Sequence, residues 1–295
     1  MRIPPRNILV PMDLSEPSMY AWRQAAGMAR KFNARLQALY VQEWFYTAFG
    51  SGAGTPMPPL EAYESTLDAL RERLGPEADV RVVNGLSDRM IVGWAERGWD
   101  MIVMGSHGRH GFDRLVRGSV AEAVVRASTV PVLVVHDYEP RIQTVLAPVK
   151  PMPYAMAGLR AAARLAAAYG ARLVAMHVVN QPVYRDADGL RGARAAIEEM
   201  LGRLPGPLLE ACRPRIELAF GDPALEIAAA SEDHSATVLV ARARGFLRDR
   251  VIGNTAQRVL RHARGLVLAV PVEAVSAPRD EATALGPTAS RARRA

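Results

Sequence analysis

Short runs of consecutive apolar residues alternate with longer amphipathic stretches along the chain. An apolar run without polar alternation is typical of a parallel strand covered on both faces, and a longer amphipathic stretch is typical of a helix packed on that sheet. The resulting order favours an open five-stranded parallel sheet with right-handed crossovers. The expected strands are Ile8–Val10, Arg35–Val41, Val80–Val83, Met101–Met104 and Val130–Val135, and the expected helices are Ser15–Phe32, Glu61–Leu74, Ser87–Arg97 and Ala121–Arg126.

The pattern then repeats. The Phe-Asn-Ala-Arg-Leu sequence at Phe32 returns as Tyr-Gly-Ala-Arg-Leu at Tyr169, and glycines recur at matching places. One period that spans about half the chain indicates a duplicated domain, because the units of a solenoid are far shorter. We therefore expect an α/β protein of two tandem parallel-sheet domains. The expected segments are a first domain at 1–137, a linker at 138–141, a second domain at 142–272 and a disordered tail at 273–295, with a long surface loop at Trp44–Pro59 inside the first domain.

Composition excludes several classes of protein. The 295 residues carry one cysteine, so no intramolecular disulfide can form, and a reducing, cytoplasmic setting is the simplest expectation. No apolar run approaches the length of a transmembrane helix or a secretion signal, so we expect no membrane association. The formal net charge of +7 is modest for this length, and part of it lies in the C-terminal tail. Nucleic-acid binding is therefore not expected.

The chemistry concentrates between Met101 and Val135. The buried strand Met101–Met104 is followed by Gly105 and Gly108, and Gly118 with Ser119 then opens a helix. Glycines at the carboxyl edge of a parallel sheet allow backbone N–H groups to approach an anion closely, and a helix N-terminus adds unpaired donors and a positive dipole end. The pattern therefore predicts a phosphate site.

These residues resemble the nucleotide signature of the universal stress protein family, G-x2-G-x9-G-[ST], in the tandem-domain form of that family. The signature follows the fourth strand, and the first strand ends in Pro11, Met12 and Asp13, as in the ATP-binding members. The resemblance covers about residues 6–272. It implies two Rossmann-like, adenine nucleotide alpha hydrolase-like domains, each an open five-stranded parallel sheet.

The resemblance also implies a role for each matched residue. Asp13 would offer its carboxylate to a ribose hydroxyl or to the adenine amine, and Val41 would line the base. Ser119 would donate its hydroxyl to a phosphate. The other expected ATP contacts are Pro11 and Met12 beside Asp13, Met104 and Gly105 beneath the ribose, and Gly108, Arg109, Gly118 and Val120 around the phosphates, with or without Mg²⁺.

Structural roles remain an alternative for each of these residues. An aspartate after a strand can cap the following turn, a glycine can serve only a turn, and a serine at a helix start can serve only as its cap. Val41 and Met104 are core residues whether or not a nucleotide contacts them. His107 and His110 have no cysteine or acidic residue at ligand spacing, so no metal site is expected.

The second half of the chain departs from the signature. Lys150 stands where the first half has Asp13, and Ala241 stands where it has Gly105, with Arg244 near the place of Gly108. A lysine cannot accept hydrogen bonds from ribose hydroxyls, and a bulky side chain obstructs a phosphate cradle. We expect a structural second domain. The rival hypothesis is that its basic residues bind another anion; they are Arg242, Arg244, Arg248 and Arg250.

The leading functional hypothesis is a cytoplasmic, ATP-binding regulator of the stress response. The resemblance implies intramolecular pairing of the two domains through Val130–Val135 and Gly265–Val270, and it leaves a further homodimer and an unknown signalling partner open. One alternative is a slow ATPase or autophosphorylating enzyme, but the chain has no Walker A motif and Asp113 is the only acid in the glycine loop. Another alternative is a nucleotide-free interaction scaffold.

Overall fold

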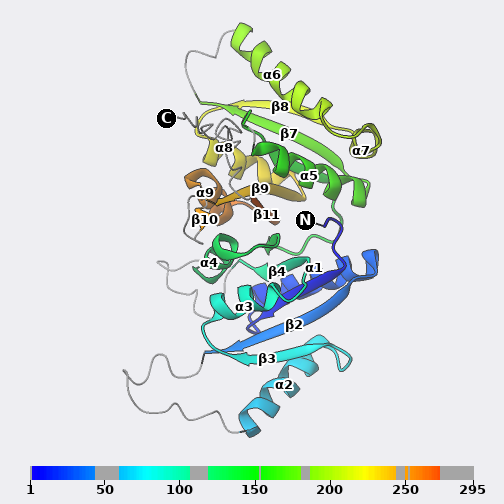
Figure 1. Ribbon diagram of the computed structural model, residues 1–295, viewed down its shortest axis with the longest axis vertical. Coiled ribbons are helices and arrows are strands. Elements are labelled where there is room, and N and C mark those ends of the chain that lie inside the picture. Colours follow the sequence, from blue (N-terminus) through cyan, green and yellow to red (C-terminus); the bar gives the residue numbers. More distant parts are fainter. Residues whose placement is uncertain are drawn as a thin grey trace, which may run out of the picture.

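A single sheet runs along the long axis of the molecule (Figure 1). The computed structural model describes residues 2–43, 60–106, 119–152, 154–180, 187–243, 250–251 and 253–272. The strands of the first repeat are β1 (Asn7–Met12), β2 (Arg35–Gln42), β3 (Val80–Asn84), β4 (Met101–Gly105) and β5 (Val132–Val135). Those of the second repeat are β6 (Thr144–Pro148), β7 (Arg172–Val179), β8 (Arg215–Phe220), β9 (Ala236–Ala243), β10 (Arg250–Val251) and β11 (Leu266–Val272).

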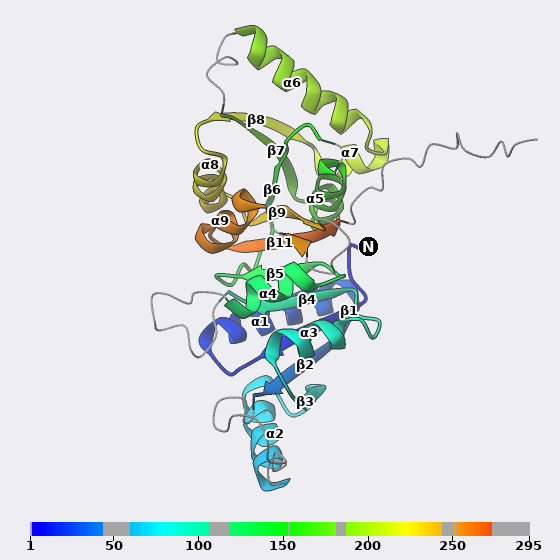
Figure 2. The ribbon, with the colours of Figure 1, turned by 60° about the vertical axis from the view of Figure 1, so that its left-hand side comes forward.

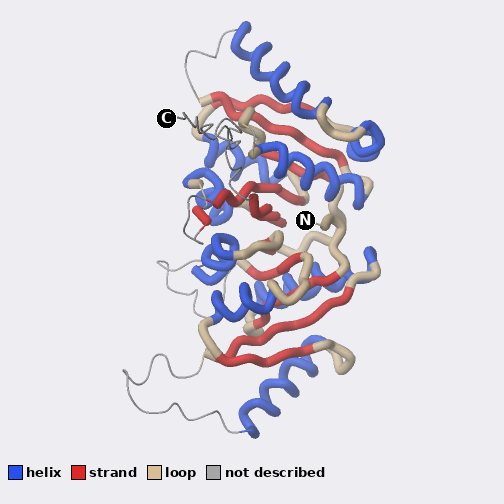
Figure 3. Tube along the Cα trace, in the orientation of Figure 1, coloured by secondary structure: helices blue, strands red, loops and turns tan. Residues whose placement is uncertain are grey.

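Helices connect the strands and lie on both sides of the sheet (Figure 3). In the first repeat they are α1 (Glu16–Phe32), α2 (Leu60–Leu74), α3 (Ser87–Ala95) and α4 (Ser119–Ala127). In the second repeat they are α5 (Ala155–Tyr169), α6 (Ala187–Gly202), α7 (Gly206–Cys212), α8 (Pro223–Ala230) and α9 (Asn254–His262), with a 3₁₀ turn at Ser231–Asp233. The predicted Trp44–Pro59 loop and the predicted tail at 273–295 lie outside the described residues.

The strand order is β3-β2-β1-β4-β5-β11-β9-β6-β7-β8, with β10 paired to β9. The main strands within each repeat are parallel, as the sequence predicted, and β5 and β11 meet in antiparallel register with Val135 opposite Leu266. The repeats therefore join edge to edge through their last strands, at the centre of the molecule (Figure 2). This is the intramolecular pairing that the sequence led us to expect.

Each face of the sheet buries one apolar core that extends through both repeats. One core packs α1, α2, α5 and α6 on the sheet, with Met28, Leu70, Leu159 and Ile197 among its buried side chains. The other packs α3, α4, α8 and α9 on the opposite face. Because both cores are continuous across the β5–β11 junction, the two repeats fold around shared apolar surfaces.

Local signals set the ends of α1 as the sequence predicted. Ser15 caps the N-terminus by accepting a hydrogen bond from the Ser18 N–H at 3.4 Å, and Pro17 occupies the first turn. Asn33 ends the helix in the left-handed conformation, with a φ of 49°. Gly170 ends α5 in the same way. The two repeats thus preserve the same helix stop with different residues.

Side chains from both repeats meet on each side of the β5–β11 junction. On one side, the buried Glu122 of α4 accepts hydrogen bonds from Gln257 and Arg261 of α9. On the other side, the rings of Phe32 and Tyr169, at the ends of α1 and α5, stand edge to face with centroids 5.2 Å apart. Polar and aromatic contacts therefore reinforce the strand pairing.

Candidate functional site

The candidate site lies where β1 and β4 end. Among the described residues, these two strands pair only at Ile8 with Met101 and at Leu9 with Ile102, although β1 continues to Met12. The order of the first repeat reverses between β1 and β4, and the carboxyl edge at such a point is where open α/β sheets bind ligands. The fold thus brings the ends of β1 and β4 and the start of α1 to one edge.

Asp13 follows β1 directly and is held by the start of α1. Its Oδ1 accepts hydrogen bonds from the Ser15 N–H at 3.0 Å and from the Ser15 hydroxyl at 2.5 Å. The same hydroxyl oxygen accepts the Ser18 N–H, so the carboxylate is tied to the first turn of the helix. The capping role that the sequence left open is therefore present. The proposed contact of Asp13 with a nucleotide stays a prediction.

The end of β2 contributes a residue that the sequence analysis did not single out. Val41 pairs with Val83 of β3 and is half-buried. The next residue, Gln42, is 9% exposed, and its side-chain Oε1 is buried with no hydrogen-bond partner among the described residues. A buried acceptor without a donor is unfavourable by about 1–3 kcal/mol. A polar residue at the end of a buried strand was the available signal, and a donor from a ligand would remove this penalty.

Gly105 has a structural reason that the sequence did not reveal. A Cβ at this position would lie 2.7 Å from the backbone carbonyl carbon of Pro17 and 2.8 Å from its oxygen. The start of α1 therefore packs directly on the end of β4. Gly105 allows this close packing, whether or not a ribose lies above it.

The helix after the glycine loop begins at Ser119, as expected from the Gly118-Ser119 pair, and holds the expected Ala121–Arg126. Ser119 thus contributes to the first turn of α4, where backbone N–H groups lack helical partners. Val120 is partly exposed. The remaining loop residues of the predicted site, together with the rest of the loop, lie outside the described residues; they are Gly108, Arg109 and Gly118, with His107, His110, Asp113, Arg114 and Arg117.

The second repeat presents different chemistry at its equivalent edge. Lys150 is exposed after β6, and the ring of His177 is 2.7 Å from the Val149 carbonyl oxygen through its Nδ1. Ala241 is buried in β9. Here the close approach of helix and strand has moved to Gly158 of α5, where a Cβ would lie 2.5 Å from a Val240 methyl carbon. A carboxylate acceptor is thus replaced by a cation at this edge. Arg244 and Arg248 lie outside the described residues, as do the side chains of Arg242 and Arg250.

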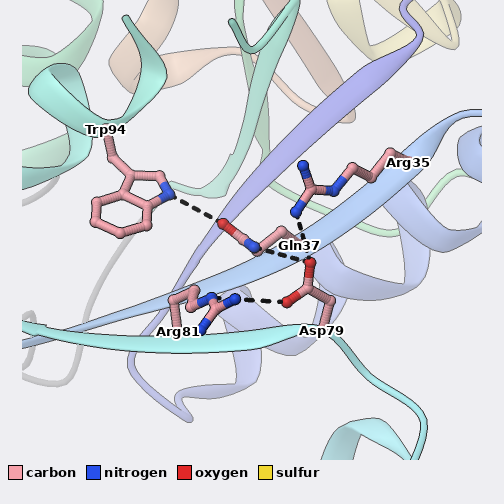
Figure 4. A network of polar contacts seen from close by, with 5 residues as sticks. All are labelled: Arg35, Gln37, Asp79, Arg81 and Trp94. Atoms are coloured by element: carbon pink, nitrogen blue, oxygen red, sulfur yellow. Dashed lines mark hydrogen bonds and ion pairs between the residues drawn. The ribbon is translucent and has the colours of Figure 1, made fainter. Parts of the chain in front are cut away.

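A polar network at the opposite ends of the strands serves the fold of the first repeat (Figure 4). The buried Gln37 of β2 donates to Asp79 at 2.8 Å and accepts from the Trp94 indole N–H of α3 at 2.9 Å, while Arg35 donates to Asp79 at 3.0 Å. Burial raises the pKa of Asp79, but the hydrogen bonds from Arg35 and Gln37 outweigh this, so its pKa lies below the ordinary value. The network links β2, β3 and α3 away from the candidate site.

Comparison with known proteins finds a match to each repeat. The model of the universal stress protein family matches residues 5–136 and again 141–271. Universal stress protein MJ0531 of Methanocaldococcus jannaschii is 32% identical over 138 residues, which cover 44% of this chain and 81% of that protein. Universal stress protein A homolog 1 of Coxiella burnetii is 30% identical over 138 residues, which cover 44% of this chain and 95% of that protein.

Solved structures match the whole two-repeat arrangement. A universal stress protein from Archaeoglobus fulgidus superposes with a TM-score of 0.66 at 22% identity, covering 90% of this chain and 98% of that one. A putative universal stress protein from Pseudomonas aeruginosa gives a TM-score of 0.61 at 17% identity, covering 91% and 94%. At these identities the likeness establishes a shared fold. No helix in the described part of the chain is both long and apolar enough to span a membrane.

Proposed function

Because the chain belongs to the universal stress protein family, with both repeats matched by the family model, we propose that its first repeat binds one ATP and that the bound state regulates a stress response in the cytoplasm. The observation that carries this proposal is the difference between the repeats at the same edge. The first has a fixed Asp13 carboxylate after β1, whereas the second has an exposed lysine. The two repeats therefore share one fold but differ in whether they offer a hydrogen-bond acceptor to a nucleoside.

Several features of the first repeat suit an adenine nucleotide. Asp13 would accept a hydrogen bond from a ribose hydroxyl or from the adenine amine, and its position is already set by Ser15. Gln42 offers a buried oxygen that lacks a donor, one residue after Val41, which would line the base. The first turn of α4, with Ser119, would donate to phosphate oxygens. The negative charge of the ATP phosphates, with or without Mg²⁺, would be attracted to the N-terminus of this helix.

The remaining contacts of this proposal come from the sequence signature. Met104 and Gly105 end β4 beneath the expected ribose, beside Pro11 and Met12 of β1. The phosphates would lie among Gly108, Arg109, Gly118 and Val120. Nothing in this set supplies the lysine of a Walker A motif or a pair of metal-binding acids, so the proposal is a binding protein with at most slow hydrolysis.

Calorimetric titration of the purified chain with ATP, AMP and a cyclic adenine nucleotide tests the proposal. We expect about one ATP per chain. Gly118→Val should abolish this binding, because a branched side chain would obstruct a phosphate approach. Gly253→Val is the matched control in the second repeat. A Cβ at Gly253 meets no atom of the described part of the chain within 4 Å and its φ is −60°, so the variant should fold and bind ATP normally.

Other results would contradict specific parts of the proposal. Loss of half the sites in Gly253→Val would show two equivalent nucleotide sites. No measurable ATP binding by the wild-type chain would favour a nucleotide-free scaffold. Rapid protein-dependent phosphate release that disappears in Asp113→Ala would make the protein an ATPase and not a binding regulator.

A further inference from the structure

The turn that carries Asp13 is strained. Leu14, between Asp13 and Ser15, has a φ of 63°, in the left-handed region that leucine rarely adopts. This conformation is unfavourable by about 1–2 kcal/mol for a residue with a side chain. No residue of the equivalent stretch 149–152 after β6 has a positive φ. Within the described residues, the strained form of this turn thus occurs in the repeat that keeps the carboxylate.

Contacts on both sides hold this conformation. On one side, the Ser15 N–H and hydroxyl donate to Asp13 Oδ1. On the other, an Arg73 guanidinium N–H from the last turn of α2 donates to the Leu14 carbonyl oxygen at 2.9 Å. The Leu14 side chain also packs against the core beneath α1. The arginine reaches the turn from a different element, 59 residues along the chain, so it can fix the turn independently of the cap.

We propose that Arg73 is a positioning residue of the nucleotide site, holding Leu14 in its left-handed conformation so that Asp13 faces the ligand. This inference rests on the proposed function. Arg73 touches the backbone of the turn and contacts no reacting group. Without it, the turn would spend part of its time in relaxed conformations that misplace the carboxylate. The apparent dissociation constant rises as the competent fraction falls.

Titration with ATP of three variants tests the role of the guanidinium. Arg73→Gln should weaken affinity roughly three- to tenfold, since one hydrogen bond from a charged donor is lost. Arg73→Lys should restore most of the affinity, because an ammonium can still donate to the carbonyl. Arg71→Gln removes a neighbouring exposed charge from the same last turn of α2 and should bind as the wild type does.

A double-mutant cycle separates positioning from charge. Glycine adopts a positive φ without strain, so Leu14→Gly should make the clamp unnecessary. In that background, Arg73→Gln should change ATP affinity less than about twofold, whereas loss of a direct electrostatic attraction to phosphate would persist unchanged. Persistence of the full effect would overturn the positioning role.

Hydrogen exchange without nucleotide separates this inference from the proposed function. The Ser15 amide is bonded to Asp13, so a peptide spanning residues 13–19 should exchange faster in Arg73→Gln than in Arg71→Gln. If the wild type binds ATP but Arg73→Gln matches it in both affinity and exchange, the inference is wrong. If the wild type fails to bind ATP, the proposed function is wrong, whatever the exchange rates.

Discussion

Gly105 has two possible explanations, and they predict different consequences of substitution. The position was expected to lie beneath a ribose, but the nearest atoms to an added Cβ belong to the Pro17 backbone. Backbone atoms cannot move aside without shifting α1, so Gly105→Ala should destabilise the protein by about 1–3 kcal/mol even without nucleotide. Urea unfolding measures this loss as a lower midpoint.

The equivalent position in the second repeat provides the control. Ala241→Gly should lower stability by about 1–2 kcal/mol, through chain entropy and the loss of one buried methyl group, without a backbone clash, since the close approach there is made by Gly158. A Gly105→Ala variant as stable as the wild type, yet unable to bind ATP, would contradict the packing explanation.

Thr237 of β9 carries a buried hydroxyl for which the described residues supply no hydrogen-bond partner. The residue is 1% exposed. Valine has nearly the same shape without the polar atom, so Thr237→Val should stabilise the protein by about 1 kcal/mol. Thermal unfolding followed by circular dichroism would show a higher midpoint. A lower midpoint would mean that this hydroxyl is satisfied in solution.

Sequence reasoning located the residues whose signals are local. The first helix was expected to end at Phe32 and does so, with Asn33 as its cap, and Asp13 was expected after the first strand, where it lies. Arg73 was missed because its importance depends on a contact with a distant segment, which no local pattern encodes. Gln42 was missed although a polar residue at the end of a buried strand is a local signal. The left-handed conformation of Leu14 was equally hidden, because leucine carries no preference for it.

At the scale of elements, Gln37 joins two strands and a helix through one side chain (Figure 4). Gln37→Met keeps the volume but leaves the Trp94 N–H without its acceptor and removes one of the donors to Asp79. We expect a loss of about 2–3 kcal/mol in unfolding free energy, measured by urea denaturation.

Arg81→Gln provides a matched control for that network. Its Nε lies 4.0 Å from an Asp79 carboxylate oxygen, and the Arg81 side chain is 59% exposed. An exposed ion pair of this kind contributes less than about 1 kcal/mol. Equal losses of unfolding free energy in Gln37→Met and Arg81→Gln would show that the hydrogen bonds of Gln37 stabilise the protein no more than the exposed ion pair does.

The order of strands and helices in the first repeat followed from the hydrophobic pattern, because buried parallel strands and amphipathic helices have distinct periods. Element ends were less predictable. The pattern placed the last strand from Val130, whereas β5 begins at Val132, and it extended the third helix to Arg97, whereas α3 ends at Ala95. The short β10 lies against α4 of the other repeat. That contact arises from how the repeats meet, which the sequence of either repeat alone does not contain.

At the scale of the whole molecule, the hydrogen bonds of Glu122 join α4 of the first repeat to α9 of the second. Burial raises the pKa of Glu122, but hydrogen bonds from Arg261 and Gln257 lower the pKa by more than burial raises it. The folded pKa therefore lies below the ordinary 4.5. A depressed carboxyl pKa contributes stability above pH 4.5 and loses it as pH falls through the folded pKa. Glu122→Gln should therefore lower stability by about 1–2 kcal/mol at pH 7, with the gap closing below pH 4.5.

Urea unfolding of both proteins at several pH values checks this dependence. Glu199→Gln is a suitable control, because its exposed pair with Arg203, four residues along α6, lies within one helix and away from the junction. That variant should stay within about 0.5 kcal/mol of the wild type. Parallel pH curves for wild type and Glu122→Gln would contradict a role for the carboxylate at the junction.

Because the β5–β11 pairing lies within one chain, its stability does not depend on the protein concentration. The segment between Val135 and Thr144 tethers the two repeats, so each meets the other at an effective concentration on the order of millimolar, however dilute the protein becomes. Two separate subunits joined by the same strands would dissociate on dilution and could exchange partners. In this chain the second repeat accompanies the first at every expression level. This chain therefore cannot signal by exchanging subunits across the β5–β11 interface. Any signal must come from a change at the surface of the two joined repeats.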